Sequence, residues 1–258
     1  MPDLSSPILP PRRGLAIETT SPRGSIAVVE GAKTLFHRVF MAERSHNSAL
    51  FEPLGEALKI LEKGRLGGGE TWRRGDSEIS NLPISQSPSL PVSYIVAGTG
   101  PGSYVGARIA IATIEALSLA LEIPALGWSS LTALVDENNV PVQGHYAVLG
   151  DARRDCFFAA VVRDGKLQSL PVPQPWSGFP DWLLANESTP KFVLEKLPEI
   201  GGVEHNLRIN LAFPDAAILA LRISQLNEAE MSEAKAQVLE PVYLRAPFTT
   251  LPKKRGLV

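Results

Sequence analysis

The stretch from Tyr94 to Trp128 constrains the fold of this chain more than any other part. It begins with a short apolar run and continues through the glycine-rich sequence GTGPGS at residues 98–103. A long segment without a helix breaker follows, until Pro124 ends it and a second short apolar run begins. Short apolar runs on both sides of a helical segment predict a strand–helix–strand unit with parallel strands.

The glycine-rich turn lies at the carboxyl end of a strand, where open α/β sheets usually bind their ligands. Ser103 is placed to cap the helix, because its hydroxyl can accept from free amides of the first turn. Two interpretations of Gly100, Pro101 and Gly102 stay open: the turn cradles an anion on helix amides, or it lets strand and helix pack closely. The turn lacks the Lys-Ser/Thr pair of a phosphate loop and the glycine spacing of a dinucleotide fingerprint, which favours close packing.

The predicted helix, Tyr104 to Glu122, has apolar side chains on every side, a pattern typical of a helix buried between layers. These side chains are Val105, Ile109, Ile111, Ile114, Leu117, Leu119 and Leu121. Arg108 and Glu115 within the helix, and Pro124 after it, argue against a membrane span. We therefore expect a core helix.

The residues before this unit predict a small antiparallel sheet and one more helix. Residues 1–13 are proline-rich and predict a flexible tail, and three short strands joined by tight turns follow within residues 15–40. Leu50, Leu54 and Leu58 then form a stripe at helical spacing, which suits a helix that covers the sheet or faces a partner. Residues 64–91 are rich in Gly, Ser and Pro, and predict a mobile surface insertion.

Two blocks of the chain echo each other, LAIETTSPRGSIAVVEGAKTL at residues 15–35 and AVLGDARRDCFFAAVVRDGKL at residues 147–167. Each block reads as an apolar strand that ends near a carboxylate, Glu18 or Asp151, followed by an arginine and a second strand. The echo predicts two lobes of related topology. We place the first lobe at residues 14–133 and the second at 134–258, whose basic C-terminal tail we expect to be frayed.

Composition excludes several functional classes. Asp and Glu number 27 against 25 Lys and Arg, so no electrostatic footprint indicates nucleic-acid binding. The single cysteine excludes an internal disulfide and suits a reducing compartment. Of the four histidines, at positions 37, 46, 145 and 205, no two lie within one helical turn, so we expect no helix-borne metal site.

The sequence GTGPGSYVGARIAIATIEALSLALEIPALGWSSLTAL (98–134) closely resembles the signature of the TsaB family. Gly100, Pro101, Gly102, Ser103, Gly106 and Arg108 match the family motif. Tyr104, Val105 and Ala107 stand where the family usually has Phe, Thr and Leu. Weaker matches are LAIETTSPRGSIAVVE, DARRDCFFAAVV and PVYLR.

This resemblance implies an α/β protein of the actin-like ATPase (ASKHA, ribonuclease-H-like) fold, with two lobes of βββαβα topology. It implies a cytoplasmic, non-catalytic subunit that pairs with TsaD, works with the ATPase TsaE, and has no membrane association. The pair would transfer a threonylcarbamoyl group, from the adenylate made by TsaC, to the adenosine next to the anticodon of tRNA. No cofactor is expected on this chain alone, whereas ATP and a metal ion are expected on partner subunits.

Pairing with TsaD is expected through helices of the first lobe. A further alternative is a stand-alone homodimeric scaffold, in which a second copy of the chain covers the same helix face. The residues that we assign to this interface are Leu50, Leu54, Leu58, Ile109, Ala110, Thr113 and Ala116. The stripe of leucines and the small side chains of the second helix suit close helix packing.

An alternative function belongs to another class, an ATP-dependent enzyme of the same fold, either a small-molecule kinase or a catalytic carbamoyltransferase. It would use Glu18 and Asp151 as nucleotide-side carboxylates, together with the turn at residues 100–103. The second lobe has no glycine-rich adenosine turn, since Gly201-Gly202 is followed by Val-Glu-His. The sequence therefore favours a subunit without catalytic residues of its own.

Overall fold

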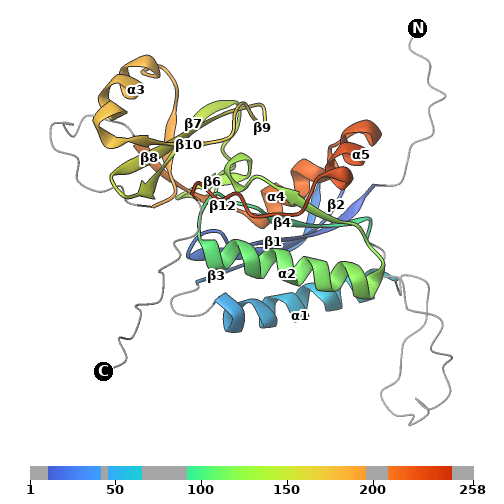
Figure 1. Ribbon diagram of the computed structural model, residues 1–258. Coiled ribbons are helices and arrows are strands. Elements are labelled where there is room, and N and C mark those ends of the chain that lie inside the picture. The colour runs from blue at the N-terminus through green and yellow to red at the C-terminus, as the bar shows by residue number, and fades with distance from the viewer. Residues whose placement is uncertain (1–10, 42–45, 66–91, 196–208, 246–258) are drawn as a thin grey trace, which may run out of the picture.

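The computed structural model describes residues 11–41, 46–65, 92–195 and 209–245, which form two sheets with helices around them (Figure 1). The first sheet has the strand order β3-β2-β1-β4-β5. Its strands are β1 (Arg13–Glu18), β2 (Arg23–Glu30), β3 (Lys33–Met41), β4 (Tyr94–Gly98) and β5 (Ala125–Trp128). β1, β2 and β3 are antiparallel neighbours, whereas β4 runs parallel to both β1 and β5. The predicted parallel strand–helix–strand unit is confirmed.

Helices cover both faces of this sheet, so its central strands are apolar on both sides. α1 (His46–Arg65) and α2 (Tyr104–Leu121) pack on one face, and α4 (Ala216–Ser224) and α5 (Glu228–Ala236) on the other. Alternation along β1 sorts its side chains, because Leu15 and Ile17 face α1 and α2 while Ala16 faces α4.

The second sheet has the order β10-β8-β7-β11-β12-β6, with β9 paired to β8. Its strands are β6 (Leu134–Asp136), β7 (His145–Arg153), β8 (Cys156–Arg163), β9 (Lys166–Leu167), β10 (Val172–Pro175), β11 (Lys191–Val193) and β12 (Ile209–Pro214), and α3 spans Phe179–Ala185. From β10 to β12 this order repeats that of the first sheet, because a meander is followed by two parallel strands on the same side. The repeat confirms the two-lobed, ribonuclease-H-like fold.

Helix α2 differs from its prediction as a helix buried on every side. Its inner face, with Ala107, Ala110 and Ile114, packs in the core, but Val105 and Leu119 are 58% and 85% exposed. In the described part of the chain, α2 is the one helix long and apolar enough to cross a membrane. Its apolar character therefore serves the core on one side only.

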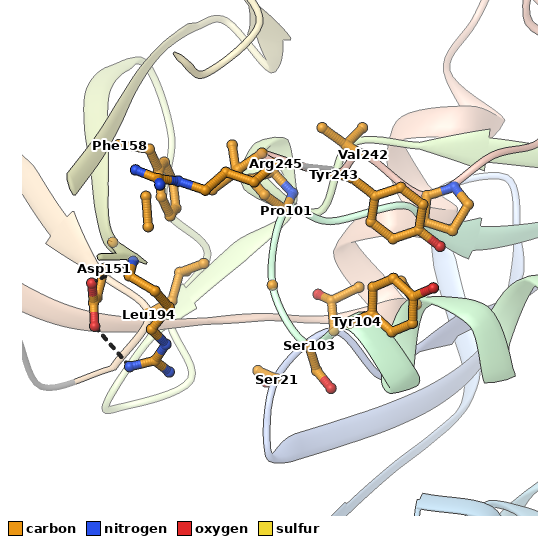
Figure 2. Close-up of a pocket in the computed structure, with 18 of the residues that line it drawn as sticks. Ser21, Pro101, Ser103, Tyr104, Asp151, Phe158, Leu194, Val242, Tyr243 and Arg245 are labelled. Atoms are coloured by element: carbon orange, nitrogen blue, oxygen red, sulfur yellow. Dashed lines mark hydrogen bonds and ion pairs between the residues drawn. The ribbon is translucent and has the colours of Figure 1, made fainter. Parts of the chain in front are cut away.

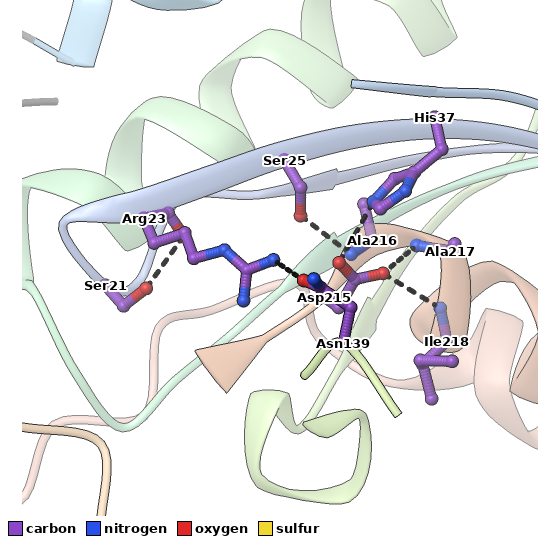
Figure 3. Close-up of polar contacts among 9 residues, drawn as sticks. All are labelled: Ser21, Arg23, Ser25, His37, Asn139, Asp215, Ala216, Ala217 and Ile218. Carbon is purple, nitrogen blue, oxygen red and sulfur yellow. Dashed lines mark hydrogen bonds and ion pairs between the residues drawn. The ribbon is translucent and has the colours of Figure 1, made fainter. Parts of the chain in front are cut away.

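The lobes are joined through the start of α4 (Figure 3). Asp215 caps this helix, since its Oδ1 accepts from the amides of Ala217 and Ile218 at 2.9 and 3.4 Å. Its Oδ2 lies 2.9 Å from Nε2 of His37, on β3 of the first sheet. Arg23 of β2 donates to Asn139 beyond β6 and lies over the ring of Phe213 on β12. These contacts hold the second sheet against the first at the side of α4.

The structure also revises the predicted segment boundaries. The tail predicted for residues 1–13 is too long, because Arg13 begins β1 and Arg12 forms an ion pair with Glu228. The predicted division at residue 133 assigns α4 and α5 to the second lobe, but both helices pack on the first sheet. Residues 64 and 65 of the predicted insertion complete α1, and residues 66–91 lie outside the described part, as does the C-terminal tail from residue 246.

Candidate functional site

A cavity of about 600 Å³ lies between the two lobes (Figure 2). The first lobe contributes residues 20–22 and the predicted glycine-rich turn with Tyr104. The second lobe contributes residues 150–154 and the two residues that follow β11, and residues 241–245 complete the wall. We call this cavity the interlobe cleft.

Gly102 in the turn and Gly106 in the first turn of α2 allow close backbone packing. A Cβ on Gly102 would lie 2.2 Å from the carbonyl oxygen of Thr20, and one on Gly106 would lie 1.8 Å from that of Thr19. The amide of Ser103 donates to the Thr20 carbonyl at 2.6 Å, and the Ser103 hydroxyl accepts from the Gly106 amide at 3.1 Å. The predicted cap is confirmed, and both of these amides are already bonded within the protein.

Glu18 does not line the interlobe cleft, although it ends β1 as predicted. Its side chain is fully buried, and one carboxylate oxygen accepts from the amide and hydroxyl of Thr20 at 2.7 and 2.6 Å. The other oxygen accepts from the Ser130 hydroxyl at 2.7 Å. Burial raises the pKa of the Glu18 carboxyl, although the bonds to Thr20 and Ser130 act in the opposite direction. In this arrangement Glu18 links the end of β1 to the residues after β5, and its carboxylate is not part of the cleft wall.

Replacing Glu18 by glutamine should therefore leave the fold intact and stabilise it at neutral pH. The amide keeps an acceptor for Thr20 and can donate to Ser130, without the cost of burying a charge. The pKa of the Glu18 carboxyl is raised above its ordinary value of 4.5 in the folded protein. Wild-type stability should therefore fall as the pH rises from 4.5 through this raised pKa, because the buried carboxyl then becomes charged. Thermal melts at pH 4 and pH 8 should show the advantage of Glu18→Gln growing with pH.

Glu18→Ala is the matched control, because it removes the acceptor of the Thr20 amide and should cost about 2 kcal/mol. Equal pH dependence of the wild type and Glu18→Gln would contradict this role for the carboxyl.

Asp151 does line the cleft, as its predicted position at the end of the equivalent strand implies. Its Oδ1 accepts from the Arg153 amide and its Oδ2 pairs with the Arg153 guanidinium, both at 2.7 Å. Arg153 also approaches Glu195 at 3.4 Å. A metal or phosphate at Asp151 would have to displace this pairing.

Apart from Asp151 and Glu195, the polar groups that line the cleft are cationic or neutral. Arg154 and Arg245 line it, and the Nε of Arg245 is buried without a hydrogen-bond partner. Within the described ranges, no three His, Cys, Asp or Glu side chains come together to hold a metal ion. The side chain of His46 and all of His205 lie outside those ranges.

A second concave surface lies on the outer side of α1 and α2, away from the sheet, and we call it the α1–α2 groove. It is lined by Phe51, Leu54, Tyr104, Val105, Arg108, Ile109, Ala112, Thr113, Ala116 and Leu117. Phe51 is 66% exposed, so the groove presents a large apolar side chain to solvent. Among the described residues that line the groove, Arg108 is the charged one.

The predicted interface residues divide between this groove and the core. Leu54, Ile109, Thr113 and Ala116 line the groove. Leu50 and Ala110 are buried against the sheet, and Leu58 is half-buried against the same core, so these three residues are corrected to core positions. Leu54 is also buried in that core, although it borders the groove.

Sequence reasoning missed Phe51, Val105 and Ala112 as groove residues. Val105, Ile109, Ala112 and Ala116 follow one another at intervals of three or four, which is the signal that marks one face of a helix.

The sequence is similar to proteins of tRNA modification. Residues 87–171 match the model of the family described as TsaD, tRNA N6-adenosine threonylcarbamoyltransferase. The chain is 24% identical to the tRNA threonylcarbamoyladenosine biosynthesis protein TsaB of Haemophilus influenzae over 255 residues, which cover 91% of this chain and 94% of that protein. It is 34% identical to TsaB of Bacillus subtilis over 94 residues, which cover 36% of this chain and 40% of that protein.

The fold is similar to that of YeaZ from Pseudomonas aeruginosa, with a TM-score of 0.50 and 20% sequence identity. That similarity covers 90% of this chain and 100% of the YeaZ chain. A further Pseudomonas aeruginosa structure, described as having similarity to peptidase YeaZ, gives a TM-score of 0.51 at 19% identity. At these identities the likeness supports the two-lobed fold.

Proposed function

We propose that this chain, which resembles the TsaB family along almost its whole length, acts in the biosynthesis of threonylcarbamoyladenosine in tRNA. Its role in that process is that of a non-catalytic cytoplasmic subunit that pairs with TsaD. The pair transfers the threonylcarbamoyl group to the adenosine next to the anticodon, with TsaE as the associated ATPase.

The α1–α2 groove is the observation that carries this proposal. The groove exposes the large side chains of Phe51 and Val105, at 66% and 58%, and it also carries the exposed small residues Ala112 and Ala116. Large exposed side chains beside small ones suit an incoming helix whose side chains fill the groove. The groove lies on α2, the helix that follows the glycine-rich turn of the family motif and contains its Gly106 and Arg108.

The chemistry of the strand ends supports a non-catalytic role. Glu18 is fully occupied by internal hydrogen bonds, and Asp151 is paired with Arg153. An ATP-dependent enzyme of this fold would need both carboxylates turned toward nucleotide and metal. We therefore assign ATP and the metal ion to the partner subunits.

The experiment is co-purification of this chain with TsaD from the same organism, followed by threonylcarbamoyl transfer assays with each chain alone and with both. We expect a stable complex and activity that requires both chains. Magnesium-dependent ATP turnover by this chain alone, without a complex, would overturn the proposal in favour of the ATP-dependent enzyme.

A further inference from the structure

Tyr104 lies where the interlobe cleft meets the α1–α2 groove. It is the first residue of α2, it lines both concave surfaces, and 44% of it is exposed. A change in its position would therefore alter the end of the groove. What holds Tyr104 in place is a segment from the far end of the chain.

Residues 238–245, the C-terminal segment, cross from one lobe to the other. Leu239 packs against the core under α1 and α2, and Leu244 packs against the core of the second sheet. Between them, the Val242 amide donates to the carbonyl of Thr99 at 2.8 Å, just before the glycine-rich turn. The segment is thus fixed at both ends, with Tyr243 between the fixed points.

Tyr243 stacks on Tyr104, with ring centroids 4.9 Å apart and an angle of 28° between the planes (Figure 2). On the groove side, Arg108 donates to the Tyr104 hydroxyl at 2.6 Å, and its guanidinium lies 5.4 Å from the centre of the same ring. Tyr243, Tyr104 and Arg108 therefore form a continuous row from the C-terminal segment to the charged guanidinium at the groove.

We propose that Tyr243 is a positioning residue for partner binding, which acts by holding Tyr104 and, through it, Arg108 in the arrangement that the partner meets. This inference rests on the proposed pairing with TsaD. Two long, exposed side chains would otherwise be free to rotate, and ordering them on association would weaken binding. Stacking on a segment that is anchored in both lobes orders them beforehand.

A double-mutant cycle tests the proposal. The dissociation constant of the complex with TsaD is measured for the wild type, Tyr243→Ala, Tyr104→Ala and the double variant. A stacked aromatic pair of this kind corresponds to about threefold to tenfold in binding, so Tyr243→Ala should weaken binding by that factor. In the Tyr104→Ala background the same change should have almost no effect, because Tyr243 then has no ring to hold.

Tyr243→Phe keeps the ring and should bind TsaD like the wild type. If Tyr243→Ala lowers the melting temperature of the free chain but binds TsaD as tightly as the wild type, Tyr243 is a structural residue only. An undiminished effect of Tyr243→Ala in the Tyr104→Ala background would mean direct contact with the partner, and would overturn positioning. If the wild type binds TsaD and Tyr243→Ala binds with the same dissociation constant, this inference is overturned and the proposed function is not. Absence of any wild-type complex would overturn the proposed function itself.

Discussion

Replacing Ala116 by glutamate should weaken the complex with TsaD about 100-fold or more, while the isolated chain keeps its fold. Ala116 is exposed on α2 and lines the groove, so the longer side chain meets no core residue. When a partner helix covers the groove, the carboxylate is buried without a cation beside it. An unpaired buried charge costs about 3 kcal/mol or more, which is a factor of about 100 in affinity.

The measurement is the dissociation constant of the complex, together with the melting temperature of the free chain. Ala185→Glu is the matched control, because Ala185 is also an exposed helical alanine but lies on α3 of the second lobe. Its change should alter neither binding nor stability noticeably. If Ala116→Glu bound TsaD as tightly as the wild type, the groove would not be part of the interface.

The sequence predicted the elements of the first lobe well, because their signals are local. The apolar runs, Pro124 and the Ser103 cap lie within one stretch, and their spacing alone predicts strand, helix and strand. Local signals could not decide what the apolar sides of α2 contact. Val105 and Ile114 look alike in sequence, yet Ile114 is buried in the core and Val105 is exposed at the groove.

The candidate site depended on contacts between distant residues, and there the sequence was less informative. The echo of Glu18 and Asp151 correctly predicted equivalent strand ends, but not that Ser130 would bind one carboxylate and Arg153 the other. Tyr243 contacts Tyr104 only because the C-terminal segment returns to the cleft. No sequence pattern around either residue predicts this contact.

Replacing Gly106 by alanine should destabilise the protein by about 3 kcal/mol, because overpacking at a rigid contact cannot relax easily. The added Cβ would lie 1.8 Å from the carbonyl oxygen and 2.8 Å from the carbonyl carbon of Thr19. The Thr19 hydroxyl also donates to the Gly106 carbonyl at 2.7 Å, so the two backbones are held together from both sides. The start of α2 would have to move away from the end of β1.

Thermal melts measure this effect, and we expect the melting temperature to fall by roughly 10 °C. Gly55→Ala is the control, because a Cβ at that position in α1 has no atom within 4 Å. Since alanine favours a helix over glycine, that variant should gain up to about 1 kcal/mol. If the motif glycine served only the approach of a phosphate, Gly106→Ala would melt like the wild type. A large loss of stability in Gly106→Ala would instead mean that this glycine of the family motif is needed for the packing of α2 on the sheet. That packing sets the position of the groove.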